Sequence, residues 1–215
     1  MERTGMIRAE ETALVLLAAG RSRRFGDRDK LAEDFLGHPL GMHVFTALEA
    51  IPFASRVAVR DGTTLDFAAR GYRVVHNDDP DAGLSRSVML GVEAAIPCGC
   101  TAILIALADM PRVTATHVYR LLDEGGGPDA IIASSNGEHP MPPVLFGSAH
   151  FEMLTTLSGQ AGARDLVRAG KHIITSAFEL VDIDTPEDLD ALRARYQRRH
   201  AAKGTDPDQR GGTEG

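Results

Sequence analysis

The sequence has no tryptophan and few aromatic residues of any kind, which make up 5% of its 215 residues. A surface that stacks single-stranded bases along its length needs such rings, so nucleic-acid binding of that kind is not expected. No run approaches the roughly 20 apolar residues that cross a bilayer, and the polar, mixed-charge start Met1–Glu11 does not resemble a secretory signal. We therefore expect a cytoplasmic protein that binds neither nucleic acid nor membrane.

Cysteine is also scarce, with Cys98 and Cys100 the two present. Two cysteines are too few for a disulfide framework or for the usual four-ligand zinc site, so we expect reduced thiols, with a metal role as the alternative. The 23 Lys and Arg against 30 Asp and Glu give a net charge of −7, which disfavours polyanionic partners in general. A small anionic ligand held by a local basic loop remains compatible with that charge.

Apolar runs alternate with amphipathic stretches along most of the chain. Ala13–Ala19 and Ala102–Ala108 are continuous apolar runs, typical of strands buried on both faces of a sheet. Strands that alternate with helices predict an α/β fold in three layers, with a mostly parallel sheet between two layers of helices. The other expected strands are Arg56–Val59, Tyr72–His76, Ala130–Ala133, Val144–Phe146 and Leu180–Ile183, and the expected helices are Pro39–Ala50, Leu65–Arg70, Ser85–Ala95, Thr114–Glu124, Phe151–Leu157 and Ala163–Ala169.

The pattern predicts one domain with a short extension at each end. A polar lead covers residues 1–11, the domain spans residues 12–199, and residues 200–215 carry no hydrophobic pattern and are expected to be disordered. Thr185 before Pro186 predicts the start of a last helix that runs to about Arg199. Basic residues near the end of this helix are explained by the helix dipole alone.

The loop after the first apolar run is rich in glycine and arginine. It lacks the G-x-G-x-x-G spacing of a dinucleotide site, and Asp27 stands after Gly26 where a P-loop would have lysine. Residues 21–30 nevertheless contain five cations and two acids, in a protein of net charge −7. Glycines that let backbone amides approach an anion, together with this local positive charge, favour phosphate binding over a merely solvated loop.

A carboxylate follows the second apolar run directly, at Asp109. Ligands of parallel α/β sheets bind at the carboxyl ends of the strands, next to the point where the winding reverses. Asp109 near a phosphate-binding loop is therefore a candidate Mg²⁺ ligand, with a helix N-cap as the alternative. Asp182 and Asp184 are two apart, so in a strand both would face the same side.

In this order, the motifs resemble those of the MobA-like nucleotidyltransferases, closest to the molybdenum cofactor cytidylyltransferase branch. The resemblance covers most of the chain, from Leu14 to about Leu192, and it rests on the order and spacing of several short segments. These segments are Leu17-Ala-Ala-Gly-Arg-Ser-Arg-Arg-Phe-Gly26 with Lys30-Leu31, Gly83-Leu-Ser-Arg-Ser87, Leu107-Ala-Asp-Met-Pro111, Pro143-Val-Leu-Phe146, Leu157-Ser-Gly159 and Val181-Asp-Ile-Asp-Thr-Pro-Glu-Asp-Leu189.

This resemblance implies a Rossmann-like, GT-A-like nucleotide-diphospho-sugar transferase fold, with a nucleotide half at about 12–134 and an acceptor half at about 135–199. It implies catalytic roles for Lys30, Arg24 and Asp109, and Mg²⁺ held by Asp109 and Asp184, with Asp182 as the alternative to Asp184. The nucleotide-binding residues that it implies are Leu17, Ala18, Ala19, Gly20, Arg24, Lys30, Asn77, Gly83, Leu84 and Ser85.

The implied reaction moves CMP from CTP to the phosphate of a molybdopterin-type acceptor and releases pyrophosphate. Ala18-Ala19-Gly20 favours the cytidylyltransferase branch, since the guanylyltransferase branch typically has a second glycine at the position of Ala19. The alternatives are a transferase of the same fold that uses GTP or another phosphorylated acceptor, and a non-catalytic cofactor-binding or insertion chaperone for a molybdoenzyme. Transient contact with a molybdoenzyme or its chaperone is a further expectation.

Overall fold

The two longest apolar runs form neighbouring strands at the centre of a seven-stranded sheet. The computed structural model describes residues 6–19, 23–26, 28–157 and 161–203. In it, β1 (Thr12–Ala18) is buried along its whole length and lies between β4 (Ser55–Arg60) and β6 (Ala102–Leu107), parallel to both. Burial on both faces explains why these strands are apolar without alternation.

The sheet runs in the order β5-β4-β1-β6-β8-β7-β9. The outer strands are β5 (Arg73–His76) at one edge and β9 (Lys171–Ile174) at the other, next to β7 (Ile131–Ser135). β8 (Pro140–Gly147) is antiparallel to both of its neighbours, whereas the remaining strand pairs are parallel. The expectation of a mostly parallel sheet is confirmed.

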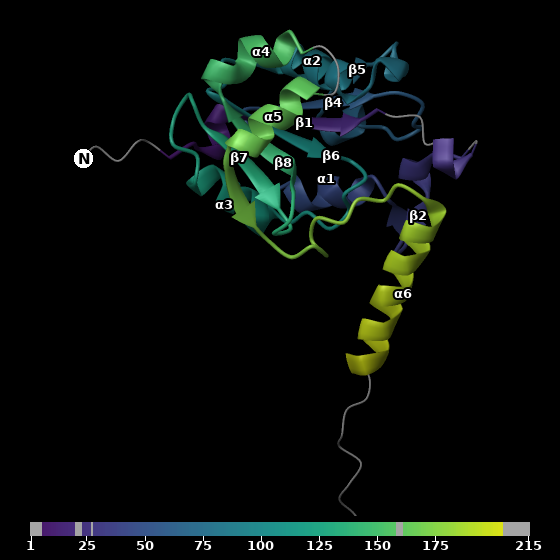
Figure 1. The fold of residues 1–215 in the computed structure, drawn as a ribbon. Helices are drawn as coiled ribbons and strands as arrows, with labels where there is room; N and C mark the ends of the chain where they lie inside the picture. The colour runs from purple at the N-terminus through teal and green to yellow at the C-terminus, as the bar shows by residue number, and fades with distance from the viewer. Residues whose placement is uncertain (1–5, 20–22, 27, 158–160, 204–215) are drawn as a thin grey trace, which may run out of the picture.

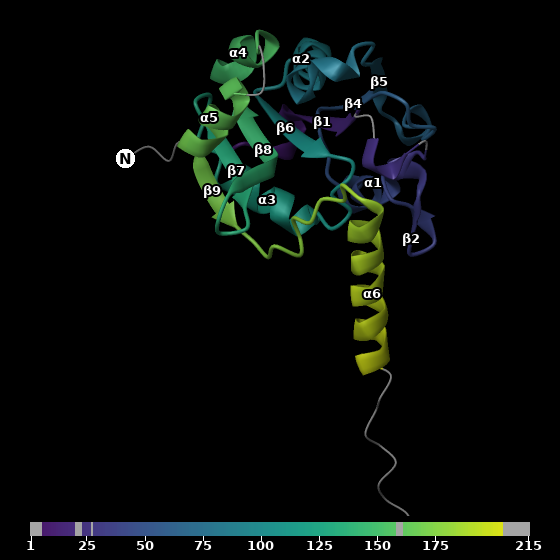
Figure 2. The ribbon, with the colours of Figure 1, turned by 45° about the vertical axis from the view of Figure 1, so that its right-hand side comes forward.

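Helices cover both faces of this sheet (Figures 1 and 2). One apolar cluster joins α2 (Leu84–Ala95), α4 (Phe151–Thr155) and α5 (Ala161–Ala169) to the upper face as drawn. A second cluster joins α1 (Met42–Leu48) and α3 (Ala115–Asp123) to the opposite face. The three-layer α/β fold expected from the sequence is therefore confirmed.

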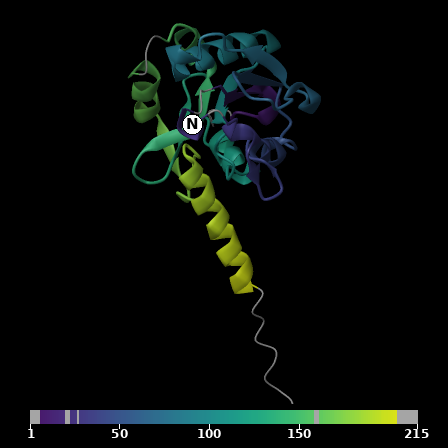
Figure 3. The same ribbon diagram turned by 90° about the vertical axis from the view of Figure 1, so that its right-hand side faces the viewer.

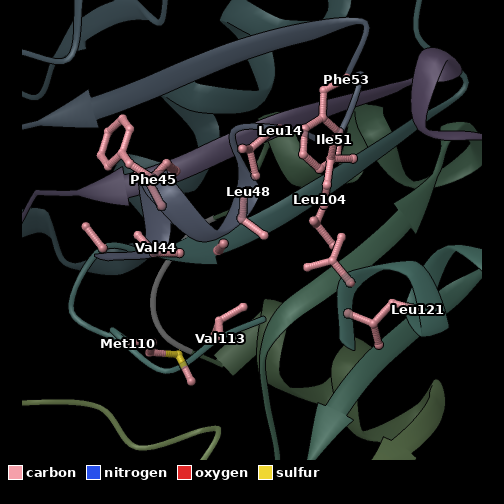
Figure 4. Packing of buried hydrophobic residues seen from close by; sticks show 14 of the residues in the cluster. Leu14, Val44, Phe45, Leu48, Ile51, Phe53, Leu104, Met110, Val113 and Leu121 are labelled. Atoms are coloured by element: carbon pink, nitrogen blue, oxygen red, sulfur yellow. The ribbon is translucent and has the colours of Figure 1, made fainter. Parts of the chain in front are cut away.

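Figure 4 shows part of the apolar cluster on the α1 side of the sheet. Leu14 of β1 and Leu104 of β6 are fully buried and meet Val44 and Leu48 of α1 and Leu121 of α3. Burying each such side chain contributes about 1.5–3 kcal/mol. The alternate residues of the same strands face the other cluster, so the core is divided by the sheet.

Helix α2 packs so closely on the sheet that one position requires glycine. A Cβ on Gly91 would lie 2.3 Å from Cγ1 of Val15 and 3.0 Å from Cγ2 of Val59. Because real Cβ atoms do not approach other heavy atoms that closely, glycine at this position allows the short distance between α2 and the strands β1 and β4. This distance also fixes where the N-terminus of α2 lies relative to the end of β1.

The last helix, α6 (Pro186–Lys203), leaves the body of the molecule and projects away from it (Figures 2 and 3). Its first turns are fixed by Leu189 and Leu192, which pack with Phe25, Phe35 and Ile183 in a third apolar cluster. Phe35 belongs to a small hairpin of β2 (Asp34–Phe35) and β3 (His38–Pro39). The helix reaches Lys203, beyond its expected end at about Arg199, and the rest of the expected tail lies outside the described residues.

Two expected elements are not formed as predicted. Leu180–Ile183 is not a strand: Leu180 and Ile183 are buried in two different clusters, and the segment pairs with no strand. Its place as the last strand is taken by β9, whose exposed lysine and histidine hide the strand pattern. The helix expected at Leu65–Arg70 is a single 3₁₀ turn at Ala68–Arg70.

Strand β8 is longer than the expected strand Val144–Phe146, and its first residues include prolines. Residues 144–147 pair with β6, whereas Pro140 and Met141 pair with β7 after a register shift at Ala133 and Ser134. Prolines lack the N–H that a strand with two neighbours would use, and they are tolerated at such an irregular, one-sided end.

The winding of the sheet reverses beside β1. The chain passes from β1 to β4 and β5 on one side, and then returns to β6 on the other side. In α/β sheets, ligands bind at the carboxyl ends of the two strands that flank such a reversal. The loop after β1 and the residue after β6 therefore lie where a ligand is expected. Among the described residues, no helix combines the length and the apolar character needed to cross a membrane.

Candidate active site

The carboxyl ends of β1 and β6 are held together by a direct backbone contact. The amide of Ala108 donates a hydrogen bond to the carbonyl of Leu17, with N and O 3.0 Å apart. The chain after β1 then forms short 3₁₀ turns at Arg23–Phe25 and Lys30–Ala32. Lys30, the first residue of the second turn, is thereby brought back to the end of β6.

Four charged side chains predicted from the sequence meet at this edge. Nζ of Lys30 lies 2.7 Å from Oδ2 of Asp109 and 3.8 Å from Oδ1 of Asp184. Nη1 of Arg24 lies 2.8 Å from Oδ2 of Asp184. The structure thus brings the two proposed phosphate-binding cations and the two proposed metal ligands into one chain of ion pairs.

Burial differs along this chain of ion pairs. The side chains of Lys30 and Asp109 are 12% and 23% exposed, whereas those of Arg24 and Asp184 are 66% and 49% exposed. Attraction between charges is screened less where water is excluded, so the Lys30–Asp109 pair is the stronger of the two. The outer pair is free to exchange partners with a charged ligand.

Asp109 keeps one unused acceptor. Its Oδ2 accepts a hydrogen bond from Lys30, but its Oδ1 is buried and has no hydrogen-bond partner. A buried carboxylate oxygen without a partner is costly, because the lost hydration is not replaced. An oxygen of this kind, beside the second carboxylate of Asp184, matches the hard oxygen donors that Mg²⁺ prefers. The residues present therefore fit a divalent cation.

Asp184 reaches the site because its segment is attached to the end of β6. The amide of Ile183 donates to the carbonyl of Asp109 at 3.0 Å, although no strand forms here. Directly after it, Thr185 and Asp188 cap α6 reciprocally: Thr185 Oγ1 accepts from the Asp188 amide at 3.1 Å, and Asp188 Oδ2 accepts from the Thr185 amide at 2.8 Å. Asp188 is thus a helix-capping acid, as the sequence indicates.

Asp182 lies beside these carboxylates as well. Partial burial and the charges of Asp184 and Asp109 raise the pKa of Asp182 above its usual range, and the nearby Lys30 opposes that shift. Three acids near two cations leave this end of the site rich in carboxylate. Within the described residues, no three His, Cys, Asp or Glu side chains are grouped closely enough to hold a metal ion by themselves.

The remaining predicted nucleotide-binding residues line the same edge of the sheet. Leu17 and Ala18 end β1 with buried side chains, so their backbone is the part that faces the loop, while Ala19 is half-buried. Gly20 lies outside the described residues. Gly83 has φ 86° and ψ −173°, a conformation restricted in practice to glycine, and it directly precedes α2.

Leu84 and Ser85 begin α2, with Leu84 50% exposed and Ser85 buried. Asn77 is 1% exposed and its amide is engaged inward: Nδ2 donates to Ser87 Oγ at 2.9 Å, and Oδ1 accepts from the Asp79 amide at 3.1 Å. Asn77 therefore orders the loop that leads into α2. Its expected contact with the base or ribose stays a prediction.

Asp29 has a role that the sequence analysis did not assign. Its carboxylate accepts hydrogen bonds from Leu31, Thr63 and Thr64, and so ties the loop after β1 to the loop after β4. The signal in the sequence is an aspartate directly before a short turn, which is a typical N-cap position. Thr63 and Thr64 carry no comparable signal, because their contact with Asp29 depends on the fold.

Cys98 and Cys100 lie far from this site in the chain and are both free thiols. Cys98 is exposed and Cys100 is buried. Burial, together with the neighbouring Cys98, raises the pKa of the Cys100 thiol to about 12. A thiol held neutral in this way is a poor nucleophile and a poor metal ligand.

Fold and site together define a nucleotidyltransferase: a doubly wound sheet with a cationic loop and carboxylates at its switch point. The chain matches the family model of the MobA-like NTP transferase domain over residues 14–174, and it belongs to that family. This membership confirms the resemblance drawn from the sequence motifs. Nucleotidyltransferases of this family are typically dependent on a divalent metal ion.

Several known proteins are similar to this chain over most of its length. The purine catabolism protein PucB of Bacillus subtilis is 32% identical over 196 residues, which cover 83% of this chain and 94% of PucB. A molybdenum cofactor guanylyltransferase of Cereibacter sphaeroides is 29% identical over 181 residues, covering 81% and 92%. The crystal structure of an rv0371c homologue from Mycobacterium sp. strain JC1 superposes with a TM-score of 0.72 at 27% identity, covering 90% of this chain and all of the other.

Proposed function

We propose that this protein transfers CMP from CTP to the terminal phosphate of a molybdopterin-type acceptor and releases pyrophosphate. The observation that carries the proposal is the meeting of Lys30 and Arg24 with Asp109 and Asp184 at the switch point of the sheet. A magnesium nucleotide needs cations for its phosphates and carboxylates for its metal ion, and this arrangement offers both. Similarity to a molybdenum cofactor guanylyltransferase supports the class of acceptor.

In the proposed reaction, an oxygen of the acceptor phosphate attacks the α-phosphorus of CTP. A new P–O bond forms, the bond between the α-phosphorus and the bridging oxygen to the β-phosphate breaks, and that oxygen leaves with pyrophosphate. The acceptor phosphate is already ionised at neutral pH, so no general base is required. Catalysis then depends on alignment of the two substrates and on stabilisation of the charge that builds on the leaving group.

Lys30 and Arg24 are the groups for the leaving pyrophosphate. Lys30 is largely buried, and Asp109 holds its ammonium in place, so it is pre-oriented before the nucleotide arrives. Arg24 is mostly exposed, and a phosphate oxygen can replace Asp184 as its partner. A buried fixed cation and an exposed exchangeable one would together orient the triphosphate.

Asp109 and Asp184 are the residues that would hold Mg²⁺. When bound, such an ion neutralises phosphate charge and polarises the phosphoryl group that is transferred. The partnerless Oδ1 of Asp109 is the acceptor that this role requires. Asp109 and Asp184 would supply two carboxylates, and phosphate oxygens and water would supply the remaining ligands.

The choice of CTP rests on the resemblance: Ala19 directly follows β1 and stands where the guanylyltransferase branch typically has a second glycine. One methyl group contributes at most about 1–3 kcal/mol to discrimination between substrates. GTP is therefore the second candidate, and it is favoured by the guanylyltransferase relative.

A panel of nucleotides tests the proposal. The purified protein is incubated with CTP, GTP, ATP or UTP, Mg²⁺ and molybdopterin that carries molybdenum, and pyrophosphate release is measured. CTP-dependent release that requires the acceptor supports the proposal. Release with GTP alone would replace CTP by GTP, and tight binding of the pterin without release from any nucleotide would indicate a cofactor-binding protein.

A further inference from the structure

We propose that Asp29 is a positioning residue for Lys30, and this inference rests on the nucleotidyl-transfer function proposed above. The carboxylate of Asp29 accepts four hydrogen bonds. Oδ1 accepts from the Leu31 amide at 3.1 Å, and Oδ2 accepts from Thr63 Oγ1 at 2.9 Å, from the Thr64 amide at 2.8 Å and from Thr64 Oγ1 at 3.1 Å. The two oxygens thus face two different segments of the chain.

Electrostatics alone would not favour a carboxylate at position 29. It lies one residue from Lys30 in a loop proposed to bind phosphates, where a second negative charge would repel the ligand. Hydrogen bonds from several donors spread and neutralise the charge of a carboxylate, and they make it a rigid anchor. The four donors around Asp29 make it such an anchor.

The backbone is held on both sides of Lys30, and Asp29 holds the side that precedes it. Asp29 is the N-cap of the 3₁₀ turn Lys30–Ala32, so its bond to the Leu31 amide spans Lys30. On the far side, Leu31 is buried and its carbonyl accepts from the Gly41 amide at 3.0 Å. With the backbone fixed before and after it, Lys30 is directed at Asp109, 2.7 Å away.

The hydrogen bonds of Asp29 form a clamp between the turn of Lys30 and the segment of Thr63 and Thr64, and this second segment is itself held in place. Thr63 is buried, and its Oγ1 also accepts from the Leu65 amide at 3.4 Å. The segment follows β4, which pairs with β1 in the centre of the sheet. The hydrogen bonds of Asp29 therefore fix the loop that carries Lys30 relative to strand β4. A shift of about 1 Å in a group that acts on the transition state costs about 100-fold in rate.

Three variants test this role through turnover. In Asp29→Asn, an NH2 group replaces one carboxylate oxygen and cannot accept a hydrogen bond from the donors that it faces. The clamp therefore loosens at nearly unchanged side-chain volume. In Thr63→Val one donor is lost at similar size. Asp66→Asn is the matched control, because the Asp66 carboxylate also accepts a hydrogen bond from an amide of a 3₁₀ turn, that of Ala69 at 3.0 Å. We expect kcat to fall about 10- to 100-fold in Asp29→Asn, less in Thr63→Val and not in Asp66→Asn, with KM for the nucleotide within about threefold.

A double-mutant cycle separates positioning from a general structural role. If Asp29 acts through Lys30, Asp29→Asn has little further effect on kcat in a Lys30→Met background. Fully additive losses in the two variants would overturn the proposal. Thermal melting of each variant shows whether the chain remains folded.

A second readout does not depend on turnover. Acylation of the Lys30 amine by a water-soluble succinimidyl ester is followed by peptide mass spectrometry. We expect the rate to change several-fold in Asp29→Asn and to stay unchanged in Asp66→Asn. Equal rates in wild type and Asp29→Asn would overturn the role of Asp29. If the wild type releases no pyrophosphate from any nucleotide but the Lys30 rate still changes, the proposed function fails and the positioning of Lys30 by Asp29 stands.

Discussion

Lys30 and Asp109 are 79 positions apart in the chain, and their charged atoms lie 2.7 Å apart at the carboxyl edge of the sheet. The two residues follow adjacent strands, β1 and β6, whose ends are joined by a backbone hydrogen bond. The pair therefore follows from the winding of the sheet. It holds a cation and an anion together at the point where both halves of a magnesium nucleotide would be bound.

Replacing Lys30 by methionine should remove most of the activity. The variant loses the fixed charge that is proposed to stabilise the leaving pyrophosphate, and we expect kcat to fall about 10²- to 10³-fold. Lys30→Arg keeps the charge but not the compact ammonium, so it should lose less. Pyrophosphate release measured at saturating nucleotide checks both variants, and a Lys30→Met protein with the wild-type kcat would contradict this role.

Arg24 and Arg28 provide a matched pair of exposed arginines in one loop. Arg24 pairs with Asp184, and Arg28 pairs with Glu33 at 3.2 Å. Exposed pairs of this kind contribute at most about 1 kcal/mol, so neither Arg24→Gln nor Arg28→Gln should lower the melting temperature by more than a few degrees. Activity should fall about tenfold or more in Arg24→Gln and stay unchanged in Arg28→Gln; equal effects would show that Arg24 has no specific role.

Divalent-metal binding should depend on the nucleotide. The two candidate carboxylates, Asp109 and Asp184, are already paired with Lys30 and Arg24, and phosphate oxygens are needed to complete a metal site. Electron paramagnetic resonance of Mn²⁺ should show weak binding alone and clear binding with a non-hydrolysable CTP analogue. Asp109→Ala should keep the fold and lose both this binding and turnover. Normal turnover of CTP with the molybdopterin acceptor by Asp109→Ala would refute the metal assignment.

His117 should make the stability of the protein depend on pH. Ser134 Oγ donates to the Pro143 carbonyl at 2.7 Å, so it accepts from Nε2–H of His117 at 2.8 Å, and Nδ1 of the ring is buried without a partner. Burial lowers the pKa of His117, with Glu179 opposing and Arg120 adding to the shift. The ring is therefore neutral in the folded protein near neutral pH.

The direction of the effect follows from proton binding. An unfolded histidine has a pKa of about 6.5, so between that pH and the lower folded pKa the unfolded chain binds the extra proton. The free energy of unfolding should then fall as the pH drops below about 6.5. Urea titrations between pH 7 and 5 check this, and His117→Gln should flatten the slope. Hydrogen bonds from Thr114 and Thr175 hold the pKa of Glu179 below its ordinary value of 4.5, although burial opposes that shift. Glu179 therefore affects the free energy of unfolding at more acidic pH than His117 does.

Gly91 should not tolerate a methyl group. The Cβ of Gly91→Ala would lie 2.3 Å from Val15 Cγ1, and relieving the clash by moving α2 should cost about 1–3 kcal/mol. Adding Val15→Ala frees the space, so the double variant should be more stable than the sum of the single changes implies. Chemical denaturation measures all three variants, and strict additivity would contradict the close approach of helix and sheet.

The sequence was most informative where physical signals were strong and local. The apolar runs that became β1 and β6 were expected within a residue of their observed bounds, and these strands place Lys30 and Asp109. Weak or mixed signals gave wrong predictions. Strand β9 was missed because Lys171 and His172 lie on an exposed edge of the sheet. Leu180–Ile183 was expected to be a strand because of its apolar residues, but Leu180 and Ile183 fill the core without strand pairing. The hydrogen bonds of Asp29 depend on Thr63 and Thr64, which lie 34 and 35 positions further along the chain, and no local pattern indicates such a contact.

The ion pair of Arg24 with Asp184 spans 160 positions, so the site joins the loop after the first strand to the segment just before the last helix. A chain that leaves the ribosome from its N-terminus exposes the first apolar runs early, but it lacks Asp184 until almost the whole domain has been synthesised. Closing so long a loop is also entropically unfavourable until the sheet between its ends is in place. The proposed catalytic site is thus among the last parts of this chain to be completed as the chain is made and folds.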